Sequence, residues 1–298
     1  MLKRSLGEKI FNVFNVLGMF MLTALFVVPV LFVIKMSLET SLIGDMTLSL
    51  FPRQPELIFY RQVVRDPAVY GPFLNSIFVT IVGTALGMLI NSVGAYALSK
   101  RELPGNKFFI YFLIIIPMLF SGGLVPTYLL IRALGMIDKM AVLIIPAVAS
   151  GWYMILIRNY YWSIPNSLVE SAKIDGAEEF TVFYKIILPL SKPVLAAIAL
   201  FTGVGFWNTF MSAIIYLRTP TKYTFPVKLR EVILLQGYTG AELEQLMIQM
   251  GIDPQKAYIS ANGLSGAMMI VSMLPIVIVY PYLQKYFTQG LMIGSIKG

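Results

Sequence analysis

The residues with the most informative types and spacing lie between Asn166 and Pro193, in the sequence NSLVESAKIDGAEEFTVFYKIILPLSKP. Ser167 and Glu170 have the spacing of a capping box, in which each side chain satisfies a free backbone amide at the start of a helix. Gly176 lacks a Cβ atom and therefore favours the left-handed turn that ends many helices. The spacing predicts a short helix that begins near Ser167 and ends at Gly176.

A second short helix is expected directly after this turn, over Ala177–Ile187, and Pro189 is expected to end it. Three aromatic side chains fall at helical spacing on it: Phe180, Phe183 and Tyr184. The segment therefore predicts a compact helix–turn–helix knob.

Several kinds of chemistry are excluded by what the chain lacks. It has no histidine and no cysteine, which removes disulfides, thiol nucleophiles and the commonest metal ligands, so no metal site is expected. It also lacks the Gly-x-x-x-x-Gly-Lys-Ser/Thr loop of P-loop ATPases. A membrane-embedded enzyme is disfavoured, because no histidine, cysteine or intramembrane carboxylate is available for acid–base or nucleophilic work.

The elements that must position the knob are apolar helices. Of the 298 residues 57% are hydrophobic and 13% are charged, whereas soluble domains have about 25% charged residues. Uncharged stretches near the ~20 residues that cross a bilayer occur at approximately Phe14–Ile34, Phe73–Ser99, Phe108–Ile131, Met140–Ile157, Pro193–Leu217 and Ser260–Gln284. They are too long for barrel strands of about ten residues. We expect an all-α membrane protein with six transmembrane helices in a single domain over residues 1–298, with core spans at about 73–284.

The basic residues predict the orientation. The first stretch is too long for a signal peptide and is expected to stay as a span. Lys3, Arg4 and Lys9 precede it, and the short loop Lys100–Lys107 lies on the same side, so the positive-inside rule predicts that both termini are cytoplasmic. The net charge of +8 is spread over several loops, which argues against nucleic-acid binding.

Two long segments fall on the opposite side, Lys35–Pro72 and Arg218–Ile259. They are either a surface for a partner or plain connectors. Within the second, Ala241–Met250 is predicted to form a short amphipathic helix.

Two of the spans carry features in their interiors. The span Phe108–Ile131 is interrupted by Pro117, Ser121-Gly122-Gly123 and Pro126, so we expect a bend, either beside a pathway or as a packed kink. The second span carries a stripe of small residues, which favours close helix packing, with a lining face that includes Asn91 as the alternative; the stripe consists of Gly83, Gly87 and Gly94.

The loop carries a family resemblance. Glu170-Ser171-Ala172, then Gly176, then Ile186-x-Leu188-Pro189 resembles the Glu-Ala-Ala loop of ABC-importer permeases, with Ser171 in place of the middle alanine. Three further runs are similar to the carbohydrate-uptake branch: Gly122–Tyr128, Phe206–Asn208 and Gly290–Gly298. Within that branch the chain looks like the maltose-type second permease subunit. It is more similar still to permeases for oligosaccharides that are released from polysaccharides such as alginate or pectin.

The resemblance implies the type I importer fold, with a cytoplasmic coupling loop at about 160–192 whose first helix sits in a cleft of an ATPase subunit. Glu170 would be its charged anchor, and the implied coupling residues are Glu170, Ser171, Ala172, Asp175, Gly176, Ala177, Ile186, Leu188 and Pro189. The implied partners are a second homologous permease, two ATPase subunits that hold ATP and Mg, an extracytoplasmic solute-binding protein, a carbohydrate and membrane lipid. This chain would bind no cofactor itself, and it would lie in a bacterial cytoplasmic (inner) membrane.

Sugars bind to aromatic faces and to neutral polar groups set among apolar walls. The candidate pathway residues are Ser121, Gly122, Gly123, Tyr128, Trp207, Asn208 and Asn262, with Thr209, Ser212 and Ser265 beside them. Each has a second reading, because Trp and Tyr also anchor helices at membrane interfaces, and Asn or Ser often bonds between helices.

Two other functions stay open at this point. One is an ABC permease for a non-sugar solute such as an amino acid. The other is an ion-coupled transporter acting alone, which is disfavoured because no span contains an ionisable residue for coupling.

Overall fold

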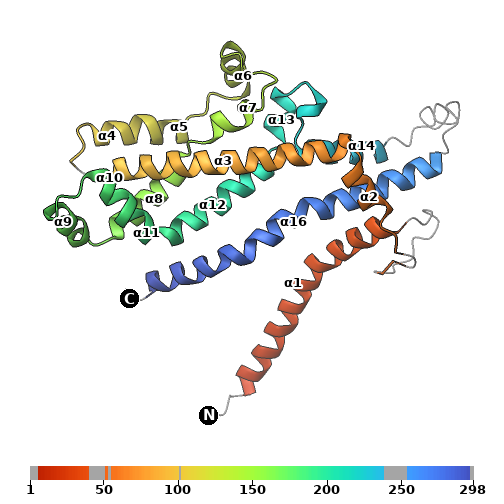
Figure 1. The fold of residues 1–298 in the computed structure, drawn as a ribbon. Coiled ribbons are helices and arrows are strands. Elements are labelled where there is room, and N and C mark those ends of the chain that lie inside the picture. The colour runs from red at the N-terminus through yellow and green to blue at the C-terminus, as the bar shows by residue number, and fades with distance from the viewer. Residues whose placement is uncertain (1–5, 40–50, 53–54, 101, 238–253, 296–298) are drawn as a thin grey trace. The chain divides into compact units, whose positions relative to one another are not determined.

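A computed structural model describes residues 6–39, 51–52, 55–100, 102–237 and 254–295, and these residues are almost entirely helical (Figure 1). Contacts between Cα atoms divide the chain into two compact units. The first comprises residues 1–70 with 229–273, and the second comprises residues 71–228 with 274–298. The expectation of a single domain stays a prediction.

The first unit is built from α1 (Leu6–Leu38), α2 (Ile58–Arg65) and the beginning of α16 (Pro254–Ser295). The Ser37 hydroxyl at the end of α1 lies 2.8 Å from the Tyr60 hydroxyl of α2. Helix α2 buries Phe59 and Val63, and it was not predicted within the segment Lys35–Pro72. The helix predicted over Ala241–Met250 lies outside the described residues.

The second unit contains the remaining helices. They are α3 (Pro67–Ser99, which begins in the first unit), α4 (Asn106–Phe109), the π-helical η1 (Ile110–Ile115), α5 (Ile116–Leu119), α6 (Leu124–Ala133), α7 (Ala141–Ile144), the 3-10 helix η2 (Ile145–Ala147), α8 (Gly151–Ser163), α9 (Asn166–Ile174), α10 (Glu179–Val182), the π-helical η3 (Phe183–Ile187), α11 (Leu188–Leu190), α12 (Lys192–Trp207), α13 (Met211–Tyr216), the 3-10 helix η4 (Pro220–Lys222) and α14 (Phe225–Gly237, which ends in the first unit).

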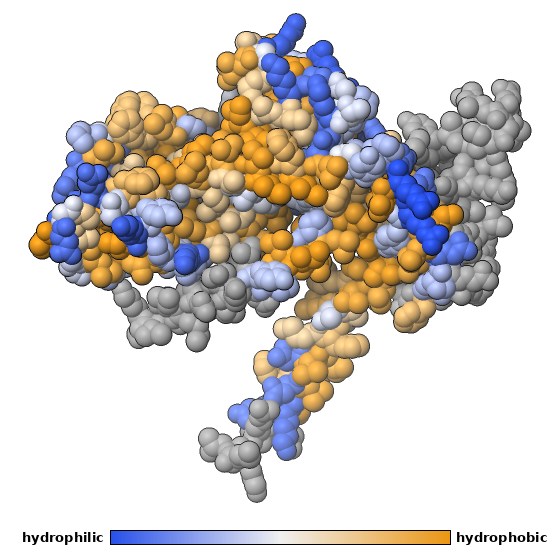
Figure 2. Space-filling model, viewed as in Figure 1, coloured by the Kyte–Doolittle hydropathy of each residue, from blue (hydrophilic) through white to orange (hydrophobic). Residues whose placement is uncertain are grey.

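Three helices of the described chain are long and apolar enough to cross a membrane, namely Gly7–Leu38, Pro67–Ser99 and Asn262–Tyr282. Three bent helix pairs bring the number to six if each pair is one span: Asn106–Leu119 with Leu124–Ala133, Ala141–Ala147 with Gly151–Ser163, and Glu179–Leu190 with Lys192–Trp207. Apolar side chains cover much of the second unit's visible surface, and polar ones gather near α9 and α10 (Figure 2). This surface suits a lipid environment.

The third predicted span, Phe108–Ile131, is broken as expected. The chain bends by 120° between its two arms. The break lies at Phe120–Gly123, where Gly123 has a φ of 79°. Pro117 lies inside the first arm directly after the π-helical η1, whose wider turn accommodates a residue that has no N–H to donate.

The fifth predicted span, Pro193–Leu217, is wrong as a continuous helix. Helix α12 ends at Trp207, the chain is irregular over Asn208–Phe210, and α13 follows. The irregular turn is held from outside the span, because the Thr224 hydroxyl donates a hydrogen bond of 2.8 Å to the Thr209 carbonyl oxygen.

The fourth predicted span bends by 47° between its two arms. Asn91 of α3 supplies the hydrogen bonds that the broken backbone has lost: its amide nitrogen donates to the Val148 carbonyl over 2.8 Å, and its oxygen accepts from the Ser150 N–H over 2.8 Å. Asn91 is 1% exposed. It is therefore a structural residue, and its alternative role on a lining face is wrong.

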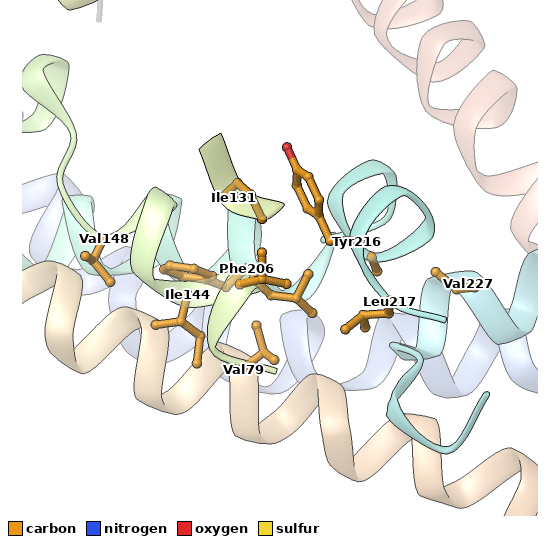
Figure 3. Close-up of a cluster of buried hydrophobic side chains, with 11 residues drawn as sticks. Val79, Ile131, Ile144, Val148, Phe206, Tyr216, Leu217 and Val227 are labelled. Carbon is orange, nitrogen blue, oxygen red and sulfur yellow. The ribbon is translucent and has the colours of Figure 1, made fainter. Parts of the chain in front are cut away.

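The glycine stripe of α3 packs against other spans, as expected. A Cβ atom at Gly83 would lie 2.7 Å from the Phe206 ring of α12, and one at Gly94 would lie 3.3 Å from Met154 of α8. Figure 3 shows the buried cluster beside this contact, where Phe206 lies among Val79, Ile131 and Ile144 from three other helices. Close packing of this kind fixes α3 against α8 and α12.

Candidate coupling site

The predicted knob exists as the α9–α11 hairpin (Asn166–Leu190), but the capping box at its start is wrong. Pro165 occupies the cap position of α9, and no side chain in the described part of the chain caps the helix. Ile164 is extended, as residues before proline usually are, with a ψ of 131°. Because Pro165 has a φ of −57°, close to that of a helix, the helix begins at Asn166, one residue before the predicted cap.

The end of α9 is as predicted and forms a complete Schellman turn. Gly176 has a φ of 79°. Its N–H donates to the Lys173 carbonyl over 3.0 Å, and the Ala177 N–H donates to the Ala172 carbonyl over 2.9 Å. These two bonds satisfy carbonyls that would otherwise be free at the helix end. The segment from Ala172 to Ala177 therefore ends the helix in a hydrogen-bonded turn and does not form a loose loop.

The second helix continues further than predicted. It begins at Glu179 and runs through the π-helical η3 to Leu190, so Pro189 does not end it. As with Pro117, the wider turn of the π segment just before the proline relieves the clash between the proline ring and the carbonyl four residues earlier. The chain then turns by 80° before α12.

One face of the hairpin packs and the other is exposed. The half-buried Ala172, Ala177 and Leu188 pack against a buried cluster that includes Tyr161, Val182 and Phe183. Ile186 is half-buried, whereas the other predicted coupling residues are exposed: Glu170, Ser171, Asp175, Gly176 and Pro189.

The exposed face also carries large apolar side chains. Ile174 is 86% exposed, Phe180 is 75% exposed and Tyr184 is 64% exposed. The Phe180 and Tyr184 rings stack with centroids 6.5 Å apart. A mixed face of apolar side chains and carboxylates on a rigid hairpin is suited to contact with another protein.

A polar junction that sequence reasoning missed holds the hairpin to α3. The Glu179 carboxylate accepts a hydrogen bond of 2.6 Å from the Tyr96 hydroxyl. It also forms ion pairs of 2.9 Å with Lys100 and 2.6 Å with Lys173. Tyr96 and Lys100 lie far from Glu179 in the sequence, so no local spacing could have predicted this contact.

The C-terminal end of α3 beside this junction is capped by side chains. Arg158 Nε donates to the Leu98 carbonyl over 3.1 Å, and Trp162 Nε1 donates to the Ser99 carbonyl over 2.7 Å. The Arg158 guanidinium lies 3.7 Å from the centroid of the Trp162 ring. Helix α8 therefore holds the end of α3 in place beneath the hairpin.

A second polar cluster lies between α6 and α7 and was also missed. Asp138 accepts a 2.6 Å hydrogen bond from the Thr219 hydroxyl and forms a 2.9 Å ion pair with Lys222. Hydrogen bonds from Thr219 and Lys222, and from the backbone N–H groups of Arg218 and Thr219, hold the pKa of the Asp138 carboxyl well below its usual range. This cluster fixes the loop before α7 to the segment after α13.

Among the described residues of the second unit, the predicted pathway residues lie on several different elements. A pocket of about 430 Å³ lies between α3, α12 and the middle of α16, and Trp207 lines it. The other lining residues are apolar apart from Thr80 and Thr84. Such walls offer few of the polar groups that a sugar site needs.

The remaining candidates lie elsewhere. Ser121, Gly122 and Gly123 form the exposed break between α5 and α6. Tyr128 of α6 stacks on Tyr216 with centroids 6.2 Å apart, Asn208 is exposed after α12, Thr209 and Ser212 flank the start of α13, and Asn262 and Ser265 belong to the first unit.

Comparison with known proteins identifies the class. Residues 106–293 match the family described as binding-protein-dependent transport system inner membrane component, and the chain belongs to this family. It is thus a permease subunit of an ABC importer, non-catalytic, with the ATPase as a partner chain. The family agrees with the resemblance of the loop and sets aside an ion-coupled transporter acting alone.

Individual relatives cover most of the chain. The polygalacturonan/rhamnogalacturonan transport system permease protein YtcP of Bacillus subtilis is 38% identical over 84% of this chain and 84% of the relative. Protein LplC of the same organism is 37% identical over 97% of this chain and 96% of the relative. The arabinooligosaccharides permease AraQ of Halalkalibacterium halodurans is 31% identical over 76% of this chain and 74% of the relative.

A solved structure has the same fold. A chain in the crystal structure of a bacterial ABC transporter involved in the import of the acidic polysaccharide alginate superposes with a TM-score of 0.84. It is 28% identical and covers 96% of this chain and 100% of that chain. The protein therefore has the all-helical type I ABC permease fold.

Proposed function

We propose that this chain is one of two permease subunits in an importer for oligosaccharides, and that its α9–α11 hairpin docks on an ATPase subunit. Two of the relatives are named as transport permeases for polygalacturonan/rhamnogalacturonan and for arabinooligosaccharides, and the structural neighbour is involved in the import of alginate. These names support a carbohydrate over an amino acid as the solute. The other partners are a solute-binding protein on the outside and ATPase subunits that hold ATP and Mg.

The proposal places the chain in the bacterial inner membrane with six spans and both termini in the cytoplasm. The basic loop Lys100–Lys107 and the basic N-terminus support this orientation. The hairpin then lies on the cytoplasmic side together with the end of α3.

One observation carries the docking role. Helix α9 is closed by a rigid Schellman turn while Ile174, Phe180 and Tyr184 on the hairpin stay exposed. Apolar side chains of this size on a polar loop contribute little to folding, and burial in a cleft of a partner would account for them. In this arrangement Glu170, Ser171 and Asp175 supply polar contacts at the rim, and Ala172, Ala177 and Leu188 hold the hairpin to the bundle. Ile186 and Pro189 support its second helix.

The docking role is tested by placing a charge in the proposed contact. Ile174→Asp should reduce co-purification of the ATPase subunits with the permease pair at least about tenfold, because burying an unpaired carboxylate opposes docking. Leu134→Asp is the matched control, since Leu134 is an apolar residue 62% exposed at the end of α6. Equal retention of the ATPase subunits by both variants would contradict the proposal.

The solute is tested separately by uptake. Vesicles that contain the complete importer should accumulate labelled galacturonan or arabinan oligomers and should not accumulate labelled amino acids. Uptake of amino acids alone would point to the non-sugar permease that the sequence left open.

A further inference from the structure

We infer that Glu179 is a positioning residue that joins the α9–α11 hairpin to the end of α3, so that displacement of α9 is passed to the membrane helices. The inference rests on the proposed docking of the hairpin. It extends that docking to the route by which movement enters the bundle.

The two oxygens of the Glu179 carboxylate contact different elements. Oε1 pairs with Lys173 in the last turn of α9 over 2.6 Å. Oε2 pairs with Lys100 over 2.9 Å and accepts the Tyr96 hydroxyl over 2.6 Å, both at the end of α3. One side chain at the start of α10 therefore connects the docking helix on one side with a membrane span on the other.

Tyr96 links this polar junction to the buried interior. Its ring lies 4.9 Å from the Phe183 ring of η3 and 6.3 Å from the Tyr161 ring of α8, measured between centroids. Lys100 Nζ lies 4.5 Å from the centroid of the same ring. A pull on the Glu179 carboxylate is thus applied to a residue whose ring already contacts two other elements, η3 and α8.

The junction is poorly explained as a device for stability alone. The side chains of Lys173 and Glu179 are 47% and 52% exposed, and Lys100 is 29% exposed. Exposed ion pairs contribute little to the free energy of folding. We assign these ion pairs a positioning role, because they determine that the end of α3 moves when α9 moves.

The test uses the complete importer in vesicles and measures solute uptake and ATP hydrolysis in the same sample. Glu179→Gln should keep the ATPase subunits bound and hydrolysis active, while the amount of solute moved per ATP falls about threefold, in line with the loss of exposed charged pairs. Tyr96→Phe, which removes only the hydroxyl, should lower the same ratio by a smaller factor. The matched control is Glu178→Gln, because Glu178 is the exposed neighbour whose side chain forms no ion pair among the described residues, and it should leave the ratio unchanged.

Lys173→Met gives a second route to the same answer. It should lower the solute-to-ATP ratio in the wild-type background and add nothing in the Glu179→Gln background, because both changes break one connection. Its effect on the melting temperature should be small, which separates positioning from folding.

Two outcomes would overturn the inference. One is an unchanged solute-to-ATP ratio in Glu179→Gln and Lys173→Met. The other is loss of the ATPase subunits from Glu179→Gln, which would mean that Glu179 serves docking itself. Failure of the docking proposal is distinct, since it would appear as full retention of the ATPase subunits by Ile174→Asp.

Discussion

Gly176 ends α9 through its backbone conformation alone. Its φ is +79°, and a Cβ atom at this position would meet no atom of the described residues within 4 Å. A substitution is therefore opposed by backbone strain and not by a clash inside this chain.

This difference makes the position testable. Gly176→Ala should destabilise the hairpin by about 1–2 kcal/mol, whereas Gly176→Asn should cost less, because asparagine tolerates the left-handed region. Both should weaken ATPase binding if a partner backbone approaches the turn closely. Melting temperature in detergent measures the first effect and co-purification the second; an asparagine variant as unstable as the alanine variant would contradict the strain argument.

Asn91 has the clearest structural role of any single polar residue in the spans. Asn91→Leu would leave the Val148 carbonyl and the Ser150 N–H without partners, and we expect a loss of at least about 2 kcal/mol. Ser92→Ala is a suitable control, since among the described residues the Ser92 hydroxyl bonds only to the Leu89 carbonyl of its own helix, over 3.2 Å. Thermal unfolding in detergent compares the two, and equal melting temperatures would show that the bent backbone finds other partners.

The lowered pKa of Asp138 leads us to expect that the stability of the protein depends on pH. Its pKa is lower in the folded protein than its ordinary value of 3.8, so its stabilisation is fully present above that value and is lost as the pH falls below it. Asp138→Asn should remove this loss, because the amide does not titrate. Melting temperatures of both proteins from neutral pH down to about pH 3 measure the effect; parallel curves would exclude Asp138 as its source.

At the level of elements, short sequence motifs predicted the features that depend on neighbouring residues alone. The end of α9 was predictable because Gly176 and the flanking alanines act within one turn of chain. Its start was mispredicted because the proline at 165 sets the first helical residue, whereas Ser167 and Glu170 only have the spacing of a cap.

The broken helices were predictable only where the sequence itself is irregular. The break after Phe120 follows from Ser121-Gly122-Gly123. The break after Trp207 depends on Thr224, and the bend near Ser150 depends on Asn91, and both supporting residues come from distant elements. The π-helical turns before Pro117 and Pro189 likewise reflect how the whole helix adjusts to a missing N–H.

The geometry of the coupling site depends on contacts between residues that are far apart in the sequence. The six apolar stretches and the knob could be read from the sequence, but the Glu179 junction joins residues of α3 to residues of α9 and α10. No periodicity encodes such a meeting, because it depends on how the helices pack. Whether the predicted pathway residues line one route stays a prediction for the same reason.

For the whole molecule, the proposed source of energy gives a further prediction. Vesicles with the complete importer should take up oligosaccharide only when ATP is supplied on the ATPase side, and an ionophore should leave uptake intact, because the predicted spans contain no ionisable residue. Labelled-solute accumulation with and without ionophore measures this. Uptake by this chain alone, driven by an ion gradient, would contradict it.

The contact between Asn91 and the bent fourth span also bears on how the protein is made. The Val148 carbonyl and the Ser150 N–H are paired by Asn91, and without it they would lie in hydrocarbon with no partner. Since synthesis proceeds from the N-terminus, the helix that carries Asn91 leaves the ribosome before Val148 does. Insertion of the later helix thus depends on its earlier neighbour, and a nascent chain that lacks Asn91 should stall at this step and become a substrate for membrane proteases.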